Sequence, residues 1–561
     1  MTKVEWSAQL ALPATHTCNR TKCATRCGSG SYADRHPNRA RRSIDAIVNG
    51  ADIGFTGNRA VSRPAPNLQS ATANETVERM VTAIIEADAR AGTKAGPFDA
   101  IPPGFEHFSY SPIGAVQKGG TWEKIRVIHH LSYPFGGDSI NNSISDDELS
   151  LGSFDQACAA IRTLGVGCWL IKLDVEAAYK QVPVRQADRA LLGLKWRGKY
   201  YYELALPFGL KSSGARWELF AAALHWFFQH HLGITLVIHY VDDFLFVVPT
   251  EADGCALLAL ALALCSRLGV PMSEKKTEGP TQCLTFLGIE INTVTMRARL
   301  SDTRLSELTA LLQSWKGRTD CTLKELQSLV GKLSFATKVV RPGRAYHGRL
   351  RAAMRAMRAN CADEAARTVR HALTPDLRAD IRWWRMFMAK WNGHSLIYEQ
   401  EWTDSIQLQL HTDACDTGYG AVYGNHWFQG IWTAAQLARA WRVNRHSMPY
   451  LEMHALVQAA LTWGHEWGGK KVVFLCDCQP VCFGINSLYS KDSDMQGLLR
   501  TLSHTAGSHG FDFRARHIPG ETNVIADALS RGCTYQELVA LSSMADVEPT
   551  PAATMPRHDH M

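Results

Sequence analysis

The sequence LVIHYVDDFLFVV, from Leu236 to Val248, is the most informative stretch of the chain. Two apolar, β-type runs flank a pair of acids, and this pattern predicts a hairpin with Asp242 and Asp243 at or beside its turn. Charged groups at the tip of otherwise buried strands are costly unless water or a cation solvates them. The apolar flanks therefore make this pair of aspartates a candidate cation site.

A third acid closes another apolar run earlier in the chain. In CWLIKLDVEAAY the run ends at Asp174, and a turn is expected after it. Three carboxylates at the ends of adjacent strands can hold two Mg²⁺ ions, which stabilise the attacking and leaving oxygens of an in-line phosphoryl transfer. The residues alone thus predict metal-dependent phosphoryl transfer.

Strand-like and helical runs alternate around these acids. Helices are predicted over Glu75–Arg90, Ser213–His231 and Ala252–Leu268. Strands are predicted over Ile125–His129, Trp169–Leu173, Leu236–His239, Phe244–Val248 and Leu284–Ile291. This mixture is typical of an α+β fold over roughly residues 105–295.

In this half the sequence resembles the reverse transcriptase family, over most of residues 105–300. Tyr240 to Asp243 resembles the family's tyrosine-any-aspartate-aspartate box, and Asp174 lies where the family has its first palm aspartate. LPFGLKSSGARWE resembles the loop that contacts template and nucleotide, and FLGIEI resembles the primer grip. The resemblance implies the fingers and palm of a right-hand polymerase. It also implies an RNA template, a DNA primer and deoxynucleoside triphosphates as partners.

The same resemblance assigns substrate-binding residues. Lys118 and Arg126 match the fingers residues that grip the triphosphate, where ammonium and guanidinium groups supply point and bidentate contacts. Tyr179 is placed under the nucleotide sugar, where a 2′-hydroxyl would collide with its ring; the alternative is a core tyrosine. Gly209 is expected to let the backbone approach a ligand closely. The full set is Lys118, Arg126, Tyr179, Phe208, Gly209, Lys275 and Lys276.

Residues 301–395 predict an almost purely helical thumb or connection segment. A capping box of Thr322 and Glu325 begins one helix, which Pro342 and Gly343 are expected to end. Eleven arginines and four acids lie between residues 341 and 385, so the local balance of 11 minus 4 is +7, equal to the net charge of the whole chain. This face either contacts phosphates or is an ordinary solvated helix surface.

A second set of four acids follows, each beside apolar neighbours on a predicted strand end or inward helix face. They are Asp413 in LQLHTDAC, Glu452 in PYLEMHAL, Asp477 in VVFLCDCQP and Asp527 in NVIADALSR. Four such carboxylates can bind two metal ions and activate a water against a phosphodiester. This set therefore predicts a metal-dependent nuclease site.

Residues 406–531 resemble ribonuclease H, an α/β domain, and the four acids match that family's order of aspartate, glutamate, aspartate and aspartate. The resemblance implies an RNA–DNA hybrid as substrate and two Mg²⁺ ions in each active site, with Mn²⁺ as the alternative. The family commonly has a histidine in a loop before the last aspartate, whereas His517 is predicted to end a strand. His454 is expected to be structural.

A polymerase followed by a ribonuclease H is the order seen in retroelements. GADIGFTGNRA, HHLSYPFGGDSINNSI and LVGKLSFATKVVRPGRAYHGRL resemble the DIRS-type retrotransposons, which insert with a tyrosine recombinase. A separately encoded recombinase is therefore an expected partner. The competing interpretations are a decayed or domesticated copy that binds nucleic acid without catalysis, and a polymerase that copies mainly DNA.

The ends and the cysteines complete the prediction. Residues 1–75 are expected to be a poorly ordered extension and 533–561 a flexible tail, flanking the fingers and palm at 76–300, the helical segment at 301–395 and the nuclease-like domain at 406–532. Fifteen cysteines and no signal peptide predict an intracellular protein, cytoplasmic or nuclear, and the longest apolar run, 12 residues, predicts no membrane partner. Cys18, Cys23 and Cys27 with two histidines are either a zinc cluster or unpaired thiols.

Overall fold

The computed structural model describes residues 37–549 apart from gaps at 119–120, 135, 146–148, 150, 360–368, 392–393, 398–401, 405–409, 442–446, 520–522 and 543–547. Its contacts divide the chain into two compact units, one of residues 1–160 and 168–281 and one of residues 161–167 and 282–561. Within the described ranges, no helix combines the length and the apolar character needed to cross a bilayer. The candidate zinc cluster near the amino terminus lies outside the described residues.

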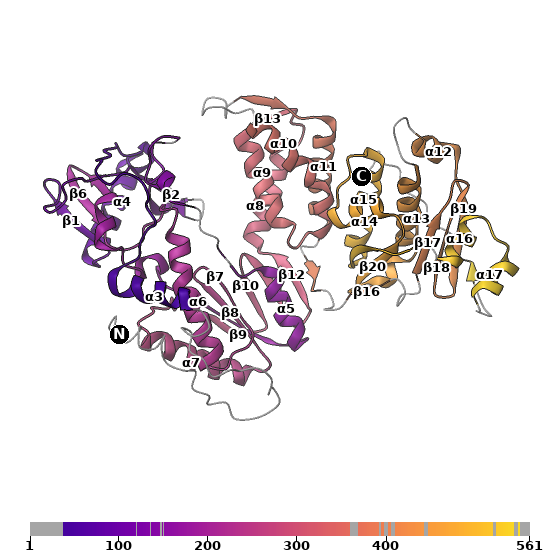
Figure 1. Cartoon of the computed structure of the whole chain (residues 1–561), viewed down its shortest axis with the longest axis horizontal. Helices are drawn as coiled ribbons and strands as arrows, with labels where there is room; N and C mark the ends of the chain where they lie inside the picture. The colour runs from indigo at the N-terminus through magenta and orange to yellow at the C-terminus, as the bar shows by residue number, and fades with distance from the viewer. Residues whose placement is uncertain are drawn as a thin grey trace. The chain divides into compact units, whose positions relative to one another are not determined.

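A four-stranded antiparallel sheet forms the centre of the first unit. Its order is β7 (Val237–Tyr240), β8 (Asp243–Val248), β4 (Trp169–Asp174) and β9 (Glu278–Thr281). Helices α6 (Ser213–His231) and α7 (Glu251–Arg267) pack against it (Figure 1). Phe228 of α6 contacts Phe244 and Phe246 of β8 in one apolar core. The predicted hairpin and both predicted helices are confirmed.

A smaller sheet and a hairpin complete the first unit. The sheet has the order β1 (Lys94–Phe98), β6 (Lys199–Glu203) and β5 (Gly193–Trp196), and the hairpin pairs β2 (Ile113–Lys118) with β3 (Thr121–His129). Helix α4 (Glu75–Arg90) has the predicted bounds, and it begins where the Asn74 side chain accepts a hydrogen bond from the backbone N–H of Val77. Val77, Val81 and Ile85 of this helix pack into the second apolar core of the unit.

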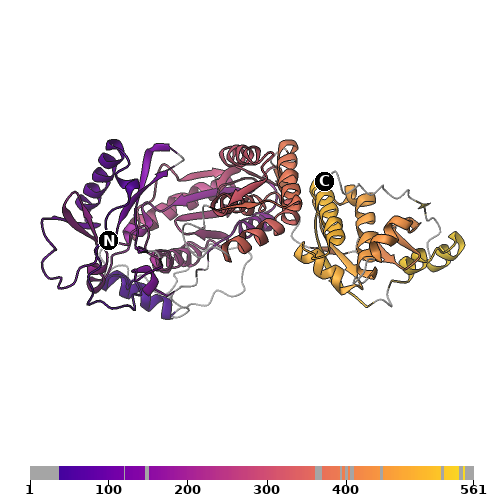
Figure 2. The same cartoon turned by 90° about the horizontal axis from the view of Figure 1, so that it is seen from above.

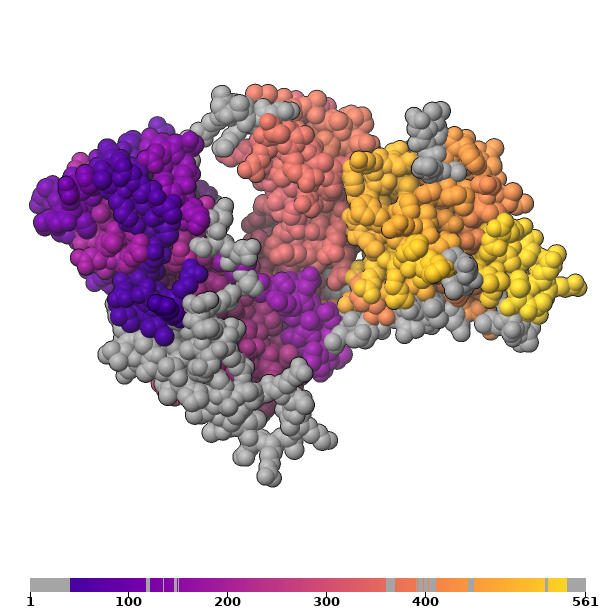
Figure 3. All heavy atoms as spheres, viewed as in Figure 1, coloured from indigo at the N-terminus to yellow at the C-terminus, as the bar shows by residue number. Residues whose placement is uncertain are grey.

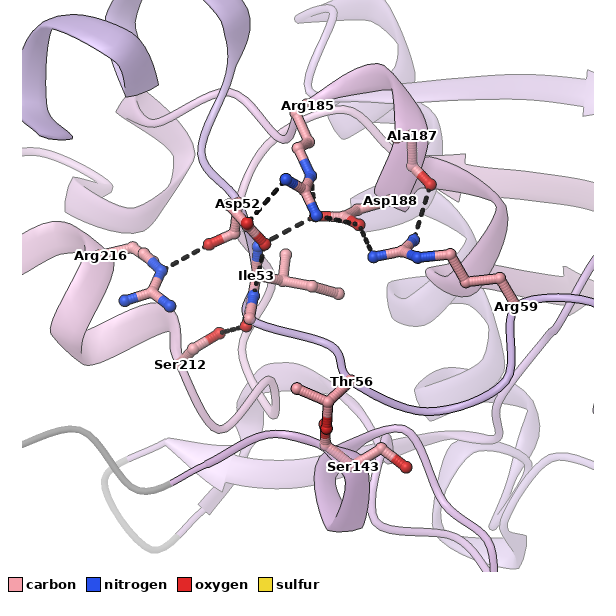
Figure 4. A network of polar contacts seen from close by, with 11 residues as sticks. Asp52, Ile53, Thr56, Arg59, Ser143, Arg185, Ala187, Asp188, Ser212 and Arg216 are labelled. Atoms are coloured by element: carbon pink, nitrogen blue, oxygen red, sulfur yellow. Dashed lines mark hydrogen bonds and ion pairs between the residues drawn. The ribbon is translucent and has the colours of Figure 1, made fainter.

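The segment before α4 corrects the prediction of a poorly ordered extension. Residues 37–49 form helix α3 (Pro37–Asn49), and Ala51, Ile53 and Phe55 after it are buried. The fully buried carboxylate of Asp188 accepts a hydrogen bond from the Ile53 N–H (3.0 Å) and pairs with Arg59 at 2.6 Å (Figure 4). We call residues 50–63 the strap. Three alternating apolar residues are too short a pattern to predict an ordered segment. The residues that they contact are also distant in sequence.

Three more residues outside the strap, Arg185, Arg216 and Ser212, bind it to the rest of the unit (Figure 4). Arg185 pairs with Asp188 at 2.8 Å and with Asp52 at 2.6 Å. Arg216 of α6 donates to the carbonyl oxygen of Asp52 (2.5 Å), and the hydroxyl of Ser212 donates to that of Ile53 (2.8 Å). The strap is therefore held by polar contacts, of which those of the Ile53 backbone are buried, as well as by apolar packing.

The second unit begins with an antiparallel sheet and a helix bundle. The sheet has the order β10 (Cys283–Phe286), β11 (Ile289–Asn292), β12 (Arg297–Leu300) and β15 (His394–Leu396). The bundle consists of α8 (Asp302–Ser314), α9 (Leu323–Ala336), α10 (Gly348–Ala359) and α11 (Pro375–Lys390), seen from two sides in Figures 1 and 2. Two short strands, β13 (Asp320–Thr322) and β14 (Arg370–Ala372), pair beside it.

Two predictions for this region need correction. The single strand predicted over 284–291 is a hairpin, because Leu287 and Gly288 turn with φ of 50° and 74°. This hairpin belongs to the second compact unit. The capping box of Thr322 and Glu325 is confirmed, but α9 ends at Ala336 and Pro342 lies in a separate 3₁₀ turn, Arg341–Tyr346.

An α/β domain follows within the same unit. Strands β17 (Leu410–Ala414), β18 (Gly418–Tyr423) and β19 (His426–Ile431) are antiparallel, with the short β22 (Glu548–Pro549) at the edge, and β16 (Thr403–Asp404), β20 (Lys471–Cys476) and β21 (Asp512–His517) are parallel. Around them lie α12 (Ala434–Ala440), α13 (Ser447–Trp463), α14 (Gln479–Ser487), α15 (Ser493–His509), α16 (Val524–Ser530) and α17 (Tyr535–Ser542). The presence of α17, with Leu538 fully buried, corrects the prediction of a flexible tail from residue 533.

The helix bundle and this α/β domain abut along α15 (Figure 3). Arg500 of α15 pairs with Asp380 of α11, and its guanidinium lies 5.2 Å above the ring of Tyr346. The side chain of Gln496 donates to the carbonyl oxygen of Ala345 (3.2 Å). These contacts place the bundle and the α/β domain in one compact unit.

Candidate active sites

The first three acids meet at one end of the central sheet. Asp174 is the last residue of β4 and pairs directly with Asp243, the first residue of β8, while Asp242 lies in the hairpin turn between β7 and β8. One oxygen of each carboxylate lies within 4.8 Å of the others. Asp174 is buried and the other two are half-buried. The structure therefore brings together the trio predicted from sequence.

Mutual repulsion and burial make this trio a poor place for three negative charges. Burial, with a contribution from Asp242 and then Asp174, raises the pKa of Asp243 to about 6. The pKa of Asp242 is also raised, mainly by burial. The ammonium of Lys276 lies 2.8 and 2.9 Å from the two oxygens of Asp174 and offsets part of the charge. Two of the carboxyl groups keep a raised pKa although the Lys276 ammonium group lies beside Asp174. The negative charge that remains is what divalent cations neutralise.

The backbone beside the trio is strained and held by tertiary hydrogen bonds. Val241, at the hairpin tip, has φ of 55°, a conformation that costs a β-branched residue of order 1–3 kcal/mol. Its carbonyl oxygen accepts from the indole N–H of Trp217 (2.7 Å), and that of Asp242 accepts from the Val175 N–H (2.9 Å). The helix α6 and the segment after β4 thus fix the position of Asp242.

Three of the predicted substrate-binding side chains gather next to the acids. The guanidinium of Arg126 lies 4.8 Å above the ring of Phe208, whose centroid is 5.3 Å from that of Tyr179. The pKa of Tyr179 is raised, first by burial and then by the charge of Asp242. The two rings and the guanidinium therefore form one surface beside Asp242.

The remaining predicted substrate-binding residues differ in how close they lie to the three acids. A Cβ on Gly209, with φ of +106°, would lie 2.0 Å from the carbonyl oxygen of His129. The close approach that Gly209 permits in this structure is to strand β3, and its approach to a ligand stays a prediction. Lys118 ends β2, and its side chain lies outside the described residues. Lys275 is exposed, and only Lys276 reaches the trio.

The second set of acids lies in the α/β domain, where carboxylate oxygens of Glu452 and Asp477 lie within 4.8 Å of each other. Asp413 lies on β17, Glu452 on α13, Asp477 after β20 and Asp527 on α16. Burial raises the pKa of Glu452 to about 9, with further contributions from Asp413 and Asp477. Burial likewise raises the pKa of Asp413 to about 6, and Asp527 and Asp477 add to it. The four acids therefore act on one another electrostatically, although Asp527 also forms an ion pair with Arg531 at 2.8 Å.

Sequence reasoning missed two groups in this cluster. The hydroxyl of Ser530 donates to Asp413 (2.7 Å), and the sulfur of Cys476 lies within 4.8 Å of oxygens of Glu452 and Asp477. The spacing of Ser530, three residues after Asp527 on a short helix, was the available signal for the first. Cys476 immediately precedes Asp477, but neighbouring side chains on a strand point to opposite faces of the sheet. No contact between the two side chains was therefore expected.

The two histidines considered for this domain differ in their surroundings. His517 ends β21, as predicted, and its Nε2 contacts the carbonyl oxygen of Asp477 at 3.0 Å. His454 is buried and forms a hydrogen bond to the side chain of Gln436 (3.1 Å).

The arginine-rich segment is only partly available to a ligand. Arg349 pairs with Asp376 at 3.2 Å, and Arg341 pairs with Asp512. Arg351, Arg355 and Arg358 are exposed on α10 at a spacing of four and three residues, so they share one face. In the described part of the chain this exposed trio has no acidic partner.

Comparisons with known proteins agree with part of this picture. Residues 125–291 match the family model described as reverse transcriptase (RNA-dependent DNA polymerase). Protein P of Duck hepatitis B virus (strain United States/DHBV-16) is 29% identical over 178 residues, which are 31% of this chain and 21% of that protein. The transposon Tf2-3 polyprotein of Schizosaccharomyces pombe is 23% identical over 375 residues, 64% of this chain and 25% of the polyprotein. The chain thus spans a quarter or less of the length of these curated relatives.

Solved structures of a foamy viral enzyme are also similar. A foamy viral protease-reverse transcriptase in complex with double-stranded DNA has a TM-score of 0.46 and 14% identity, over 82% of this chain and 72% of that one. Another, in complex with an RNA/DNA hybrid, has a TM-score of 0.46 and 15% identity, over 82% of this chain and 56% of that one.

Proposed function

We propose that this chain, whose residues 125–291 match the reverse transcriptase family model, is an RNA-directed DNA polymerase that also has ribonuclease H activity. It copies a retroelement RNA into DNA and degrades the RNA strand of the resulting hybrid. The observation that carries the proposal is the pair of carboxylate clusters, one in each compact unit, in which burial raises the pKa of the acids. Each cluster has an excess of negative charge, which divalent cations can neutralise.

In the first unit, we assign the central sheet to the palm and the smaller sheet with its hairpin to the fingers. Asp174, Asp242 and Asp243 hold the cations, for which Mg²⁺ is the proposed identity and Mn²⁺ the alternative. The chemistry that such cations supply is stabilisation of the attacking and leaving oxygens. Arg126 contacts the triphosphate, and Tyr179 and Phe208 form the surface under the nucleotide sugar. Deoxynucleoside triphosphates, an RNA template and a DNA primer are the corresponding partners.

In the second unit, the helix bundle acts as the thumb or connection and the α/β domain as the ribonuclease H. Asp413, Glu452, Asp477 and Asp527 hold its cations. The raised pKa of Glu452, about 9, allows this residue to keep a proton until a cation binds. Ser530, by donating to Asp413, fixes the direction of that carboxylate.

We further propose that the element is of the DIRS type, with a separately encoded tyrosine recombinase as partner. The support is the resemblance of three sequence stretches, two of which lie in the strap and in the turn around Pro342. We propose an intracellular site of action, cytoplasmic or nuclear, on the basis of the odd number of cysteines.

Primer extension tests the proposed function. The full chain is given a matched RNA or DNA template, a labelled DNA primer and deoxynucleotides, with Mg²⁺, with Mn²⁺ or with a chelator. We expect extension on RNA that requires a divalent cation. Nucleic-acid binding without extension would identify a non-catalytic copy, and extension on DNA alone would identify a DNA-templated polymerase.

A further inference from the structure

The second carboxylate cluster contains a group that the proposed hydrolysis does not use, the thiol of Cys476. Val472, Phe474 and Cys476 alternate along β20, and all three belong to the core that α13 helps to form. The pleat of the strand therefore turns Cys476 toward the α13 side. The residue is 7% exposed, so its sulfur lies where β20 passes from the core into the acid cluster.

The sulfur shares its space with two of the acids. Sγ of Cys476 and one oxygen each of Glu452 and Asp477 lie within 4.8 Å of one another. Glu452 is itself 7% exposed, and Asp413 adds a further negative charge nearby. A small cation in this space can therefore contact one sulfur and two oxygens from three side chains at once.

The sulfur is held in place by the turn at the end of β20. The backbone N–H of Cys478 donates to Sγ of Cys476 at 3.4 Å, and the thiol of Cys476 donates to the carbonyl oxygen of Cys478 at 3.8 Å. The thiol of Cys482 donates to the carbonyl oxygen of Cys476 at 3.7 Å. These contacts keep the sulfur beside the acids, where a bound metal would displace its proton.

We propose that Cys476, Glu452 and Asp477 form a binding site for a thiophilic divalent cation such as Zn²⁺ or Cd²⁺, and that its binding inhibits the hydrolytic site. On binding, the thiol proton passes to solvent and a sulfur–metal bond forms, with no change of oxidation state. Thiolate ligands select Zn²⁺ and similar ions over Mg²⁺, which prefers carboxylate and water. The inhibition rests on the proposed ribonuclease H function, whereas the binding does not.

The first cluster offers no equivalent ligand. Among the described residues its metal-binding group consists of Asp174, Asp242 and Asp243, all oxygen donors. The two clusters therefore differ in the softness of their ligand atoms. At low concentration a thiophilic cation should inhibit the second site and leave the first site active. DNA synthesis by the same chain serves as the internal control.

Cd²⁺ is the probe, because a cadmium–thiolate bond gives an ultraviolet charge-transfer band without any need for activity. The full chain, kept reduced, is titrated with Cd²⁺ as wild type, Cys476→Ser and the matched control Cys478→Ser, whose thiol is two residues away and outside the metal-binding group. Because other cysteines also bind Cd²⁺, the wild-type-minus-variant difference spectrum is the measurement. We expect a band in the difference spectrum of Cys476→Ser and none in that of Cys478→Ser.

The same three proteins are then assayed with Mg²⁺ for hybrid cleavage and primer extension in the presence of Cd²⁺. The Cd²⁺ concentration that halves cleavage should rise by about tenfold or more in Cys476→Ser, since loss of even a supporting partner of a metal ligand costs that much affinity. Extension should keep its wild-type response.

Three results would overturn the proposal: equal Cd²⁺ bands in wild type and Cys476→Ser, equal sensitivity of cleavage, or inhibition that needs an oxidant and no metal. If Cys476→Ser does not fold, Glu452→Gln, which keeps the thiol, should weaken Cd²⁺ binding at the same band, and unchanged binding would count against the site. A chain with the band but no cleavage would refute the ribonuclease H function and leave the metal site standing.

Discussion

At the scale of single residues, Asp243 has the clearest electrostatic signature in the first cluster. Burial and the neighbouring Asp242 and Asp174 raise its pKa from 3.8 to about 6. Folding therefore favours the protonated carboxyl group, so the metal-free protein loses stability as the pH rises from 3.8 to about 6 and stays destabilised above it. A divalent cation that binds the ionised form relieves this loss.

We therefore expect Asp243→Asn to stabilise the metal-free protein at neutral pH. The expected gain in the free energy of unfolding is about 1–2 kcal/mol, after allowance for solvent screening of a half-buried group. The gain should vanish at about pH 3–4, where the carboxyl group is protonated in both folded and unfolded chains. Urea denaturation in a chelator at both pH values measures it. A gain of equal size at both would show that the charge of Asp243 is not its source.

Tyr179 is expected to distinguish deoxynucleotides from ribonucleotides. Its ring, 5.3 Å from that of Phe208, forms part of the surface beside Asp242. Tyr179→Ala should reduce the deoxy-to-ribo ratio of kcat/KM by about tenfold or more, because a lost steric contact of this size changes discrimination by about 1–3 kcal/mol. Tyr179→Phe keeps the ring and should keep the ratio. An unchanged ratio in folded Tyr179→Ala would make this residue part of the core only.

At the scale of elements, the strap depends on one buried carboxylate. Asp188 is fully buried and binds the Ile53 N–H, Arg59 and Arg185. Asp188→Asn should lower the free energy of unfolding by about 1.5–3 kcal/mol, because the buried Ile53 N–H and two partly exposed arginines lose a charged acceptor. Asp99→Asn is the matched control, since Asp99 forms an exposed ion pair with Lys199 outside the strap and its loss should cost about 1 kcal/mol or less. Equal effects of the two variants would mean that the strap contributes little.

The exposed face of α10 is the element that we expect to contact nucleic-acid phosphates. Arg351, Arg355 and Arg358 lie on that face, whereas Arg349 is paired with Asp376. Substituting the three by Gln should weaken duplex binding equally for every sequence. It should also reduce the slope of log K against log salt by up to about 0.9 per lost contact. Arg349→Gln should change the slope less, and a wild-type slope for the triple variant would place this face away from the duplex.

Elements with strong local patterns were predictable, whereas features made by distant residues were not. Helix α4 and the β7–β8 hairpin follow from periodicity, and Asp174 could be grouped with Asp242 and Asp243 because strand ends of one sheet lie together. The strap was missed because the partner of Ile53 lies 135 residues away. Cys476 was overlooked for the same reason, since what it contacts is set by tertiary packing.

At the scale of the whole molecule, the account requires two independent active sites. The trio of Asp174, Asp242 and Asp243 lies in one compact unit, and the set that contains Glu452 and Asp477 lies in the other. Each set therefore has to bind its cations with its own carboxylates. Amide replacements keep side-chain volume while they remove the charge that holds a cation, so folding should change little.

The most direct test of the central claim is to measure primer extension and hybrid cleavage side by side in Asp242→Asn and Asp477→Asn. We expect Asp242→Asn to lose extension, to below about a hundredth of wild type if cation binding supplies several kcal/mol of transition-state stabilisation, and to keep cleavage of the RNA strand. Asp477→Asn should lose cleavage and keep extension. Loss of both activities in either variant, in protein shown to be folded by circular dichroism, would contradict the existence of two separate sites.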